Sequence, residues 1–260
     1  MGSAILVKKD FNIIEGFDYK RYIPVEYIES NGTDGSYINT LVKPVGTDLV
    51  TGLEKLNNLK IEADMAFSST PTGSSTTQVL FGAGYYSGTT ANRRQMLVGY
   101  RGATSTSEPS YMNAGGSIGS GVKAFSDATL DANRHIYGID QVNSNFIFDD
   151  KTQSFSTSVN STLTSNLLIF ASQQSSTSGS PIGWYSSAKC YGFKISVWDS
   201  NEGVFKIIRN LIPAVERSSM KVGLWDPVYY FHEGVDPYAF TYGKILNYDV
   251  NSIIMTSKGS

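Results

Sequence analysis

Short runs in which apolar and polar residues alternate recur along the chain. A period of two is typical of a β-strand with one buried face, because successive side chains point to opposite sides of a strand. The clearest run is Lys60 to Phe67, where Glu62 and Asp64 stand between apolar neighbours and form an acidic outer face. A second run predicts a core strand in which apolar positions alternate with small or polar ones: Tyr191, Phe193, Ile195 and Val197 against Gly192, Lys194 and Ser196.

Polar and glycine-containing segments separate these runs and predict turns. The cluster Asp199 to Gly203 tolerates turn dihedral angles, so Val204 to Leu211 should fold back antiparallel on the preceding strand. Arg134 to Gln141 and Asn145 to Phe148 predict another hairpin. Since short strands are many and almost no stretch has a period of 3.6 residues, the chain is expected to be an all-β, antiparallel sandwich. Further strands are expected within residues 37–42, 79–82, 95–100, 167–170 and 222–234.

Several segments carry a more specific signal when they are taken together, in chain order. Near the carboxyl end they are the Lys-x-Tyr-x-x-Lys-Ile strand from Lys189, Arg-Asn-Leu-Ile-Pro-Ala from Arg209, Gly-Leu-Trp-Asp from Gly223, and Tyr230-Phe231 with Gly234. Upstream they are residues 24–32, 37–40, 61–67 and 134–150. This series resembles the concanavalin A-like, laminin-G-like jelly-roll domains of phage and prophage virion proteins and of some bacterial surface proteins. The resemblance implies an antiparallel two-sheet jelly-roll sandwich.

The resemblance also divides the chain into three parts. Residues 23–242 are expected to form the laminin-G-like sandwich, residues 1–22 an amino-terminal arm, and residues 243–260 a carboxyl-terminal tail. The arm has apolar segments separated by charge, and these need a surface to pack against. That surface is either the edge of the sandwich itself or a neighbouring subunit or virion protein, which the arm would join by strand addition. We expect the arm to serve attachment or oligomerisation, with a homotrimer favoured.

Composition and charge limit the classes of partner that the chain is expected to bind. The formal net charge is -2 and the pI is near 5.7, so no general basic field is available to attract nucleic acid. No apolar run approaches the roughly 18 residues that a membrane span requires, and the amino terminus lacks a signal-peptide pattern. Membrane insertion and conventional secretion are therefore not expected. This agrees with a virion protein that is assembled in the host cytoplasm.

The fold that the chain resembles includes glycoside hydrolases, so its carboxylates are candidates for catalysis. Those hydrolases place their catalytic pair on one strand as Glu-x-Asp-x-x-Glu, and retaining hydrolysis needs two carboxyl groups about 5 Å apart. Glu62-Ala63-Asp64 begins this pattern, but Phe67 stands where the second glutamate is required. The catalytic pair is incomplete, and the chain is expected not to be an enzyme.

Other reactive side chains give no catalytic or metal-binding pattern. His135 and His232 lack the spacing of a zinc site or a catalytic triad, and the single cysteine, Cys190, is interpreted as a structural thiol that makes no internal disulfide. Asp149-Asp150 is a fragment of what a calcium site needs, since calcium takes six or more oxygen ligands. A plain turn is favoured there, and no cofactor is expected.

Recognition of sugar is the remaining candidate activity. Sugars present hydroxyl groups and weakly apolar ring faces, so their sites combine aromatic rings with hydrogen-bonding side chains. Three expected loops supply such residues: Tyr85, Tyr86, Arg93 and Arg94; Tyr111 and Asn113; and Gln173, Trp184 and Tyr185. We therefore expect a non-enzymatic phage fibre or structural protein whose lectin-like domain binds host-surface glycan. The alternatives are a purely architectural virion protein, and a glycoside hydrolase with an unrecognised site.

Overall fold

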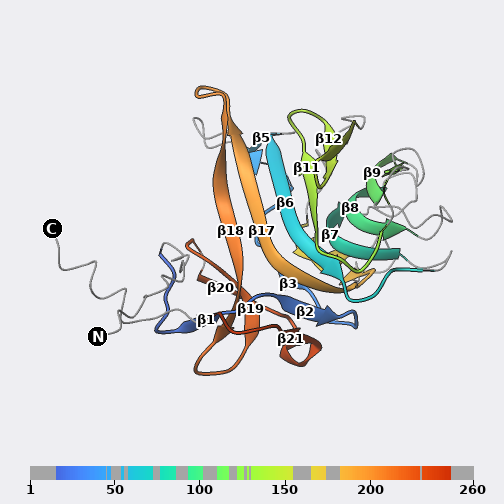
Figure 1. The fold of residues 1–260 in the computed structure, drawn as a ribbon. Coiled ribbons are helices and arrows are strands. Elements are labelled where there is room, and N and C mark those ends of the chain that lie inside the picture. Colours follow the sequence, from blue (N-terminus) through green and yellow to red (C-terminus); the bar gives the residue numbers. More distant parts are fainter. Residues whose placement is uncertain are drawn as a thin grey trace, which may run out of the picture.

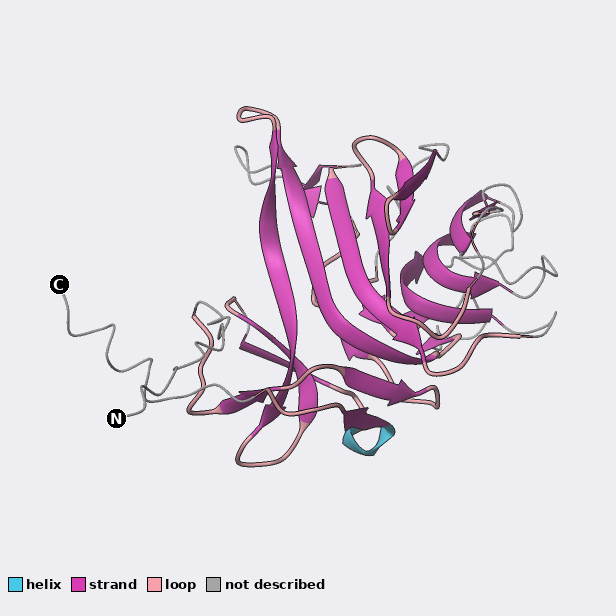
Figure 2. Ribbon diagram, viewed as in Figure 1, coloured by secondary structure: helices cyan, strands magenta, loops and turns pink. Residues whose placement is uncertain are grey.

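The computed structural model describes residues 16–44, 46–47, 54–55, 58–72, 77–85, 93–101, 110–116, 122–125, 128, 130–154, 165–173, 182–228 and 230–246. Within these ranges the chain is all-β, as predicted, and its paired strands are antiparallel (Figures 1 and 2). The helical structure in this part of the chain is one 3-10 turn, η3 (Pro237–Ala239). No helix in these ranges is long and apolar enough to span a bilayer.

A large sheet forms the framework of the described structure. Its strands, in spatial order, are β13 (Lys151–Ser154), β12 (Asn145–Phe148), β11 (His135–Asp140), β6 (Leu59–Phe67), β17 (Ser187–Asp199), β18 (Val204–Glu216), β19 (Val222–Asp226) and β20 (Tyr230–Glu233). Three further strands attach at its lower end: β1 (Tyr22–Pro24) pairs with β18, and β2 (Ile28–Asn31) pairs with β17 and β21 (Phe240–Tyr242). The expected hairpins at Asp199–Gly203 and between β11 and β12 are confirmed.

A smaller sheet packs against the large one. Its order is β10 (Val122–Ala124), β9 (Ser110–Gly116), β8 (Arg93–Arg101), β7 (Thr77–Tyr85), β14 (Leu168–Ile169) and β3 (Ile38–Asn39). Two short strand pairs are not hydrogen-bonded into either sheet: β15 (Ser172–Gln173) with β16 (Ile182–Gly183), and β4 (Gly46–Thr47) with β5 (Glu54–Lys55).

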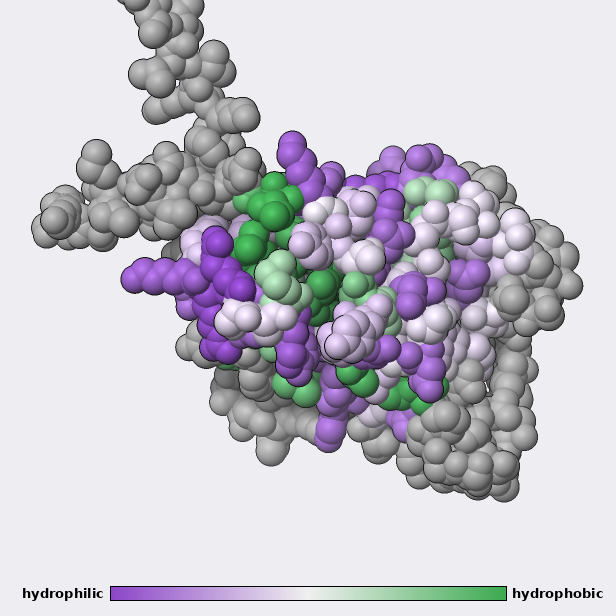
Figure 3. Space-filling model, turned by 90° about the horizontal axis from the view of Figure 1, so that it is seen from below, coloured by the Kyte–Doolittle hydropathy of each residue, from purple (hydrophilic) through white to green (hydrophobic). Residues whose placement is uncertain are grey.

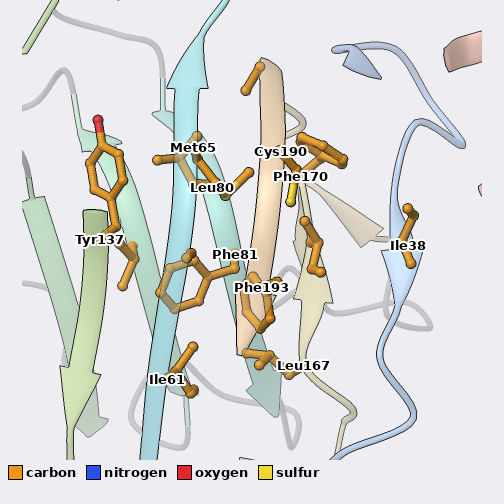
Figure 4. Close-up of a cluster of buried hydrophobic side chains, with 14 of the residues drawn as sticks. Ile38, Ile61, Met65, Leu80, Phe81, Tyr137, Leu167, Phe170, Cys190 and Phe193 are labelled. Atoms are coloured by element: carbon orange, nitrogen blue, oxygen red, sulfur yellow. The ribbon is translucent and has the colours of Figure 1, made fainter. Parts of the chain in front are cut away.

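The main hydrophobic core lies between the two sheets. The rings of Phe81 on β7 and Phe193 on β17 meet edge to face, with their centroids 5.2 Å apart (Figure 4). Strand β6 contributes its apolar face as the alternation predicted: Ile61, Ala63, Met65 and Phe67 are buried. Burial of each large apolar side chain contributes about 1.5–3 kcal/mol, so contacts across this layer hold the sheets together.

The large sheet divides at its centre. Strands β17 and β18 pair from Asp199 and Val204 as far as Phe193 and Leu211, and then they separate. The start of β17 continues beside β2, whereas the end of β18 continues between β1 and β19 (Figure 1). The position of this division decides where the molecule has a hollow on its outer face.

The segment before β1 packs on the outer face of the divided sheet. Phe17 and Tyr19 are buried against Trp225 of β19, and the Phe17 and Trp225 ring centroids lie 4.7 Å apart. Residues 17–22 of the expected arm therefore lie along the domain itself, while residues 1–15 are outside the described ranges. At the other end, Ile245 forms a bridge with Val25, and residues 247–260 of the expected tail are outside these ranges.

Candidate functional site

A hollow of about 340 Å³ opens on the outer face of the large sheet, where β17 and β18 part. Its size lies at the lower end of the range for small-molecule sites, roughly 300–1,000 Å³. The residues that line it come from β6, β11, β17 and β18: Glu62, Asp64, Ile136, Tyr191, Gly192, Phe193, Lys194, Asn210, Leu211 and Ile212.

A β-bulge shapes the hollow. Cys190 pairs with Met65 and Gly192 pairs with Asp64, so Tyr191 is an extra residue with no partner of its own on β6. A bulge shifts the alternation of the side chains that follow or precede it. The prediction that Tyr191 belongs to the buried face was wrong for this reason: Phe193, Ile195 and Val197 are buried, but Tyr191 is half-buried beside the ring of Tyr27.

Cationic side chains hold the two tyrosine rings in place. The guanidinium of Arg134 lies 4.3 Å from the centroid of the Tyr191 ring, and the ammonium of Lys189 lies 4.9 Å from that of Tyr27. The two ring centroids are 5.2 Å apart. Such cation–π contacts contribute about 0.5–1 kcal/mol each at exposed sites. Tyr191, which lines the hollow, is thus held by contacts with the Arg134 guanidinium and the Tyr27 ring.

Asp64 fixes the position of Arg134. The guanidinium donates from Nε and Nη2 to the two carboxylate oxygens of Asp64, at 2.6 and 2.5 Å. The hydrogen bond to Asp64 raises the pKa of Arg134 above its ordinary value. Because both oxygens of Asp64 accept from one guanidinium, this carboxylate has a structural task and its charge is compensated.

The other polar groups that line the hollow have fewer hydrogen-bond and ion-pair partners among the described residues. The carboxylate of Glu62 pairs with the Lys60 ammonium at 3.1 Å. In the described part of the chain, neither the Lys194 ammonium nor the Asn210 side-chain amide has a hydrogen-bond or ion-pair partner. The hollow therefore combines available donors and acceptors with apolar surface from Ile136 and Ile212, a mixture that suits a saccharide.

Three residues predicted to bind sugar do lie near one another, at the β15–β16 hairpin. Gln173 pairs with Ile182, which lies two residues before Trp184 and three before Tyr185. Trp184 packs against Val79 and Leu97 on the small sheet. The Tyr185 hydroxyl donates to the carboxylate of Asp34 at 2.6 Å, and burial together with this hydrogen bond raises the pKa of Tyr185. Trp184 and Tyr185 thus make contacts that stabilise this end of the domain.

The other six predicted residues are placed only in part. Tyr86 is outside the described ranges. The remaining five lie in strands rather than in loops, and their side chains are not described: Tyr85, Arg93, Arg94, Tyr111 and Asn113. Strand register brings Tyr85 opposite Arg94 and Tyr111 opposite Val98, so both sets belong to the small sheet. That these residues form one site with Trp184 stays a prediction.

Sequence reasoning did not select the residues of the hollow. Glu62 and Asp64 were interpreted as a solvated strand face, and Lys194 as a polar position between core residues. The available signal was Gly192, because an isolated glycine inside a strand pattern indicates a bulge or a close approach of another group. The division of the sheet had no such signal, because it depends on pairing between strands far apart in the chain.

The histidines make hydrogen bonds to carboxylates. His135 lies 2.8 Å from Asp149 through Nδ1 and 3.0 Å from Asp131 through Nε2. Burial lowers the pKa of His135, but the two hydrogen bonds outweigh it, so that the net pKa is raised. His232 is buried and lies 2.6 Å from Asp226 through Nε2.

Asp149 and Cys190 are the remaining candidates for metal and thiol chemistry. No group of three or more His, Cys, Asp or Glu side chains in the described ranges is placed to hold a metal ion. Asp149, for which the sequence favoured a plain turn over a calcium ligand, lies in a turn and accepts from the backbone N–H of Ile136 at 2.9 Å. Cys190 is fully buried, and burial raises the pKa of its thiol to about 12.

Comparisons with known proteins leave the chain without a family assignment. No protein-family model matches it, and no curated protein or solved structure matches it either.

Proposed function

We propose that this chain is a non-enzymatic, lectin-like domain of a bacteriophage virion protein, and that it binds host-surface glycan in the hollow between β17 and β18. The observation that carries the proposal is the composition of that hollow: the supported ring of Tyr191 beside the uncommitted side chains of Lys194 and Asn210. A sugar can lay an apolar face against the aromatic and aliphatic surface while its hydroxyl groups bond to the polar side chains.

The proposal of a virion protein comes from the laminin-G-like resemblance. On the same ground we propose that the two sheets form a jelly-roll sandwich and that the protein is assembled in the host cytoplasm. The arrangement of the resembling segments supports this extension. Most of them lie on strands of one sheet, namely β2, β6, β11, β12, β17, β18, β19 and β20. Segments that are scattered in the sequence thus build one continuous surface.

Binding without catalysis is favoured by the state of the carboxylates in the hollow. Both oxygens of Asp64 accept from Arg134, and Glu62 pairs with Lys60. Phe67, at the position of the missing glutamate, is buried in the core. A hydrolase would need a proton donor and a nucleophile on opposite sides of a glycosidic bond. Release of reducing sugar from a bound polysaccharide would reinstate the hydrolase alternative.

The architectural alternative draws support from the underside of the domain. Tyr238 is 94% exposed and Val235 56% exposed, on either side of the start of η3. Seen from below, apolar surface is broken into small patches by hydrophilic side chains (Figure 3). Small patches of this kind suit a weak or repeated contact between copies better than a large obligate interface. Light scattering on the full chain, with and without residues 1–15, tests whether the arm assembles copies into a trimer.

The direct test is binding of the full chain to a glycan array, followed by titration of the strongest ligand in solution. Tyr191→Ala removes the ring in the hollow, and Tyr238→Ala is a matched control on a tyrosine that does not line it. We expect Tyr191→Ala to weaken binding about tenfold or more, since truncation of an aromatic anchor at a binding site can cost about 2 kcal/mol, and Tyr238→Ala to bind as wild type. Binding to no glycan, or equal binding by both variants, would overturn the proposal.

A further inference from the structure

The charges around the hollow do not cancel. Asp64 is compensated by Arg134 and Glu62 by Lys60, each through a direct ion pair. Lys194 is the remaining charged residue of the lining, and it has no ion-pair partner in the described ranges. The lining and its ion-pair partners therefore carry one surplus positive charge. Glu26 and Lys189, which also act on Tyr191 from outside the lining, have opposite signs and do not change this sum. A neutral ligand would meet Lys194 only as a hydrogen-bond donor, whereas an acidic ligand would also pair with its charge.

Strand register places Lys194 in the middle of the surface that lines the hollow. It stands opposite Glu62 on β6 and opposite Asn210 on β18. Gly192 lies two positions earlier on the same outward face and contributes no side chain. Lys194 therefore stands between Glu62 on one neighbouring strand and Asn210 on the other, and along its own strand Gly192 leaves the space beside it without a side chain.

Nothing in the backbone at Gly192 requires a glycine. A Cβ atom built there would meet only the carbonyl oxygen of Leu211, at 4.0 Å, which is an ordinary contact, and the residue does not have a positive φ. By contrast, a Cβ at Gly223 would lie 2.3 Å from the carbonyl oxygen of His232. The absence of a side chain at Gly192 thus has one visible effect, which is to keep the space before Lys194 and Tyr191 open.

We propose that the hollow selects a saccharide that carries a negative charge, and that Lys194 binds its acidic group. This inference rests on the proposed function and names the class of glycan. A lysine ammonium offers three donors and a compact charge, so it suits a carboxylate, a sulfate or a phosphate on a sugar. Asn210 can donate to the same group or to a neighbouring hydroxyl, while the ring of Tyr191 supports the sugar itself.

The test uses pairs of ligands that differ only in charge. Uronic-acid and sialylated tetrasaccharides are titrated into the full chain, each beside its carboxyl-reduced, neutral counterpart, and sulfated and phosphorylated saccharides form two further arms. We expect at least one acidic form to bind about ten- to a hundredfold more tightly than its neutral partner, and this ratio to fall in high salt. The arm that binds best identifies which acidic group is recognised.

Variants at Lys194 separate this inference from the proposed function. Lys194→Gln should lower the affinity for the acidic form much more than the affinity for the neutral form, because only the acidic form pairs with the lysine charge, whereas Lys194→Arg should retain part of the preference. Lys20→Gln is the matched control, because Lys20 lies in an exposed turn and does not line the hollow. Equal binding of acidic and neutral forms, or an unaltered preference in Lys194→Gln, would overturn the inference. If binding still depended on Tyr191 in that case, the proposed function would stand. Failure of every saccharide to bind would overturn both.

Discussion

The guanidinium of Arg134 donates a hydrogen bond to each carboxylate oxygen of Asp64, on the adjacent strand, at 2.6 and 2.5 Å. Asp64 lies on β6, and Arg134 directly precedes β11. The ion pair sets the plane of the guanidinium, which in turn lies over the ring of Tyr191 on β17. One pair of residues thus links three strands and positions the aromatic wall of the hollow.

Replacement of Arg134 by methionine should weaken both the fold and the site. The methionine keeps the aliphatic length but removes the ion pair and the cation–π contact. Since the Arg134 side chain is about half exposed, we expect a loss of only about 1 kcal/mol in the free energy of unfolding. Urea titration measures this loss. Arg134→Lys should bind saccharide less tightly than wild type, because a point charge cannot hold two oxygens and the ring together; equal affinity would contradict the positioning role.

The contacts of His135 predict a stability that depends on pH. The pKa of His135 is raised in the folded protein. The stability that His135 contributes is therefore complete below its unfolded pKa of about 6.5, and it is lost as the pH rises through its folded pKa. Burial raises the pKa of Asp131, but its hydrogen bonds to His135 and Asn133 together outweigh this effect, so the net pKa is lowered and the stability that Asp131 contributes is lost in acid. The network should therefore contribute most between about pH 4 and 6.5.

His135→Asn tests this dependence. We expect the variant to be less stable than wild type by about 1 kcal/mol near pH 5.5, and the difference to shrink by about pH 9. Denaturant titrations across this range, with His232→Asn as a second variant, measure it. A difference for His135→Asn that stays constant from acid to alkaline pH would show that the imidazole acts through packing alone.

Phe17 should behave as a core residue even though it lies in the expected arm. Its ring packs against Tyr19 and Trp225, with both centroid distances at 4.7 Å. Phe17→Ala should cost about 3 kcal/mol of unfolding free energy, as for other buried aromatic residues. A truncation that starts at Gly16 retains this cluster and should melt well above one that starts at Ile23. Equal melting temperatures for the two truncations would contradict the packing account.

The sequence was sufficient for features that depend on local pattern. Alternation predicted the buried face of β6 with Ile61 and Met65 inward, and turn chemistry predicted the Asp199–Gly203 connection. The hairpin of β11 and β12 followed from the same signals. These features were predictable because each is decided by neighbours in the chain: period-two burial for strands, and residues that tolerate turn dihedral angles between them.

The candidate site depended on relationships that local pattern does not contain. Alternation assigned Tyr191 to the core, but the bulge beside Cys190 moved it to the outer face. The hollow also requires that β18 leave β17 at Leu211, and this follows from pairing with β1 and β19. Long-range pairing decides which outward residues converge. Aromatic and polar loops, which sequence reasoning selected, were therefore an incomplete guide.

Substitutions at Gly192 alone can test the claim that the hollow binds saccharide, because the space beside this residue is open. Gly192→Ala should fold normally and gain up to about 0.5–1 kcal/mol of stability, since glycine in a strand interior is unfavourable. Gly192→Phe should also fold, because its Cβ position meets no close neighbour, but its ring would occupy the hollow.

The most direct measurement is the dissociation constant of the best array ligand for wild type, Gly192→Ala and Gly192→Phe, with a melting temperature for each. We predict three folded proteins and a loss of saccharide binding in Gly192→Phe alone. Binding by Gly192→Phe with the affinity of wild type would place the ligand elsewhere and contradict the assignment of the hollow as the site.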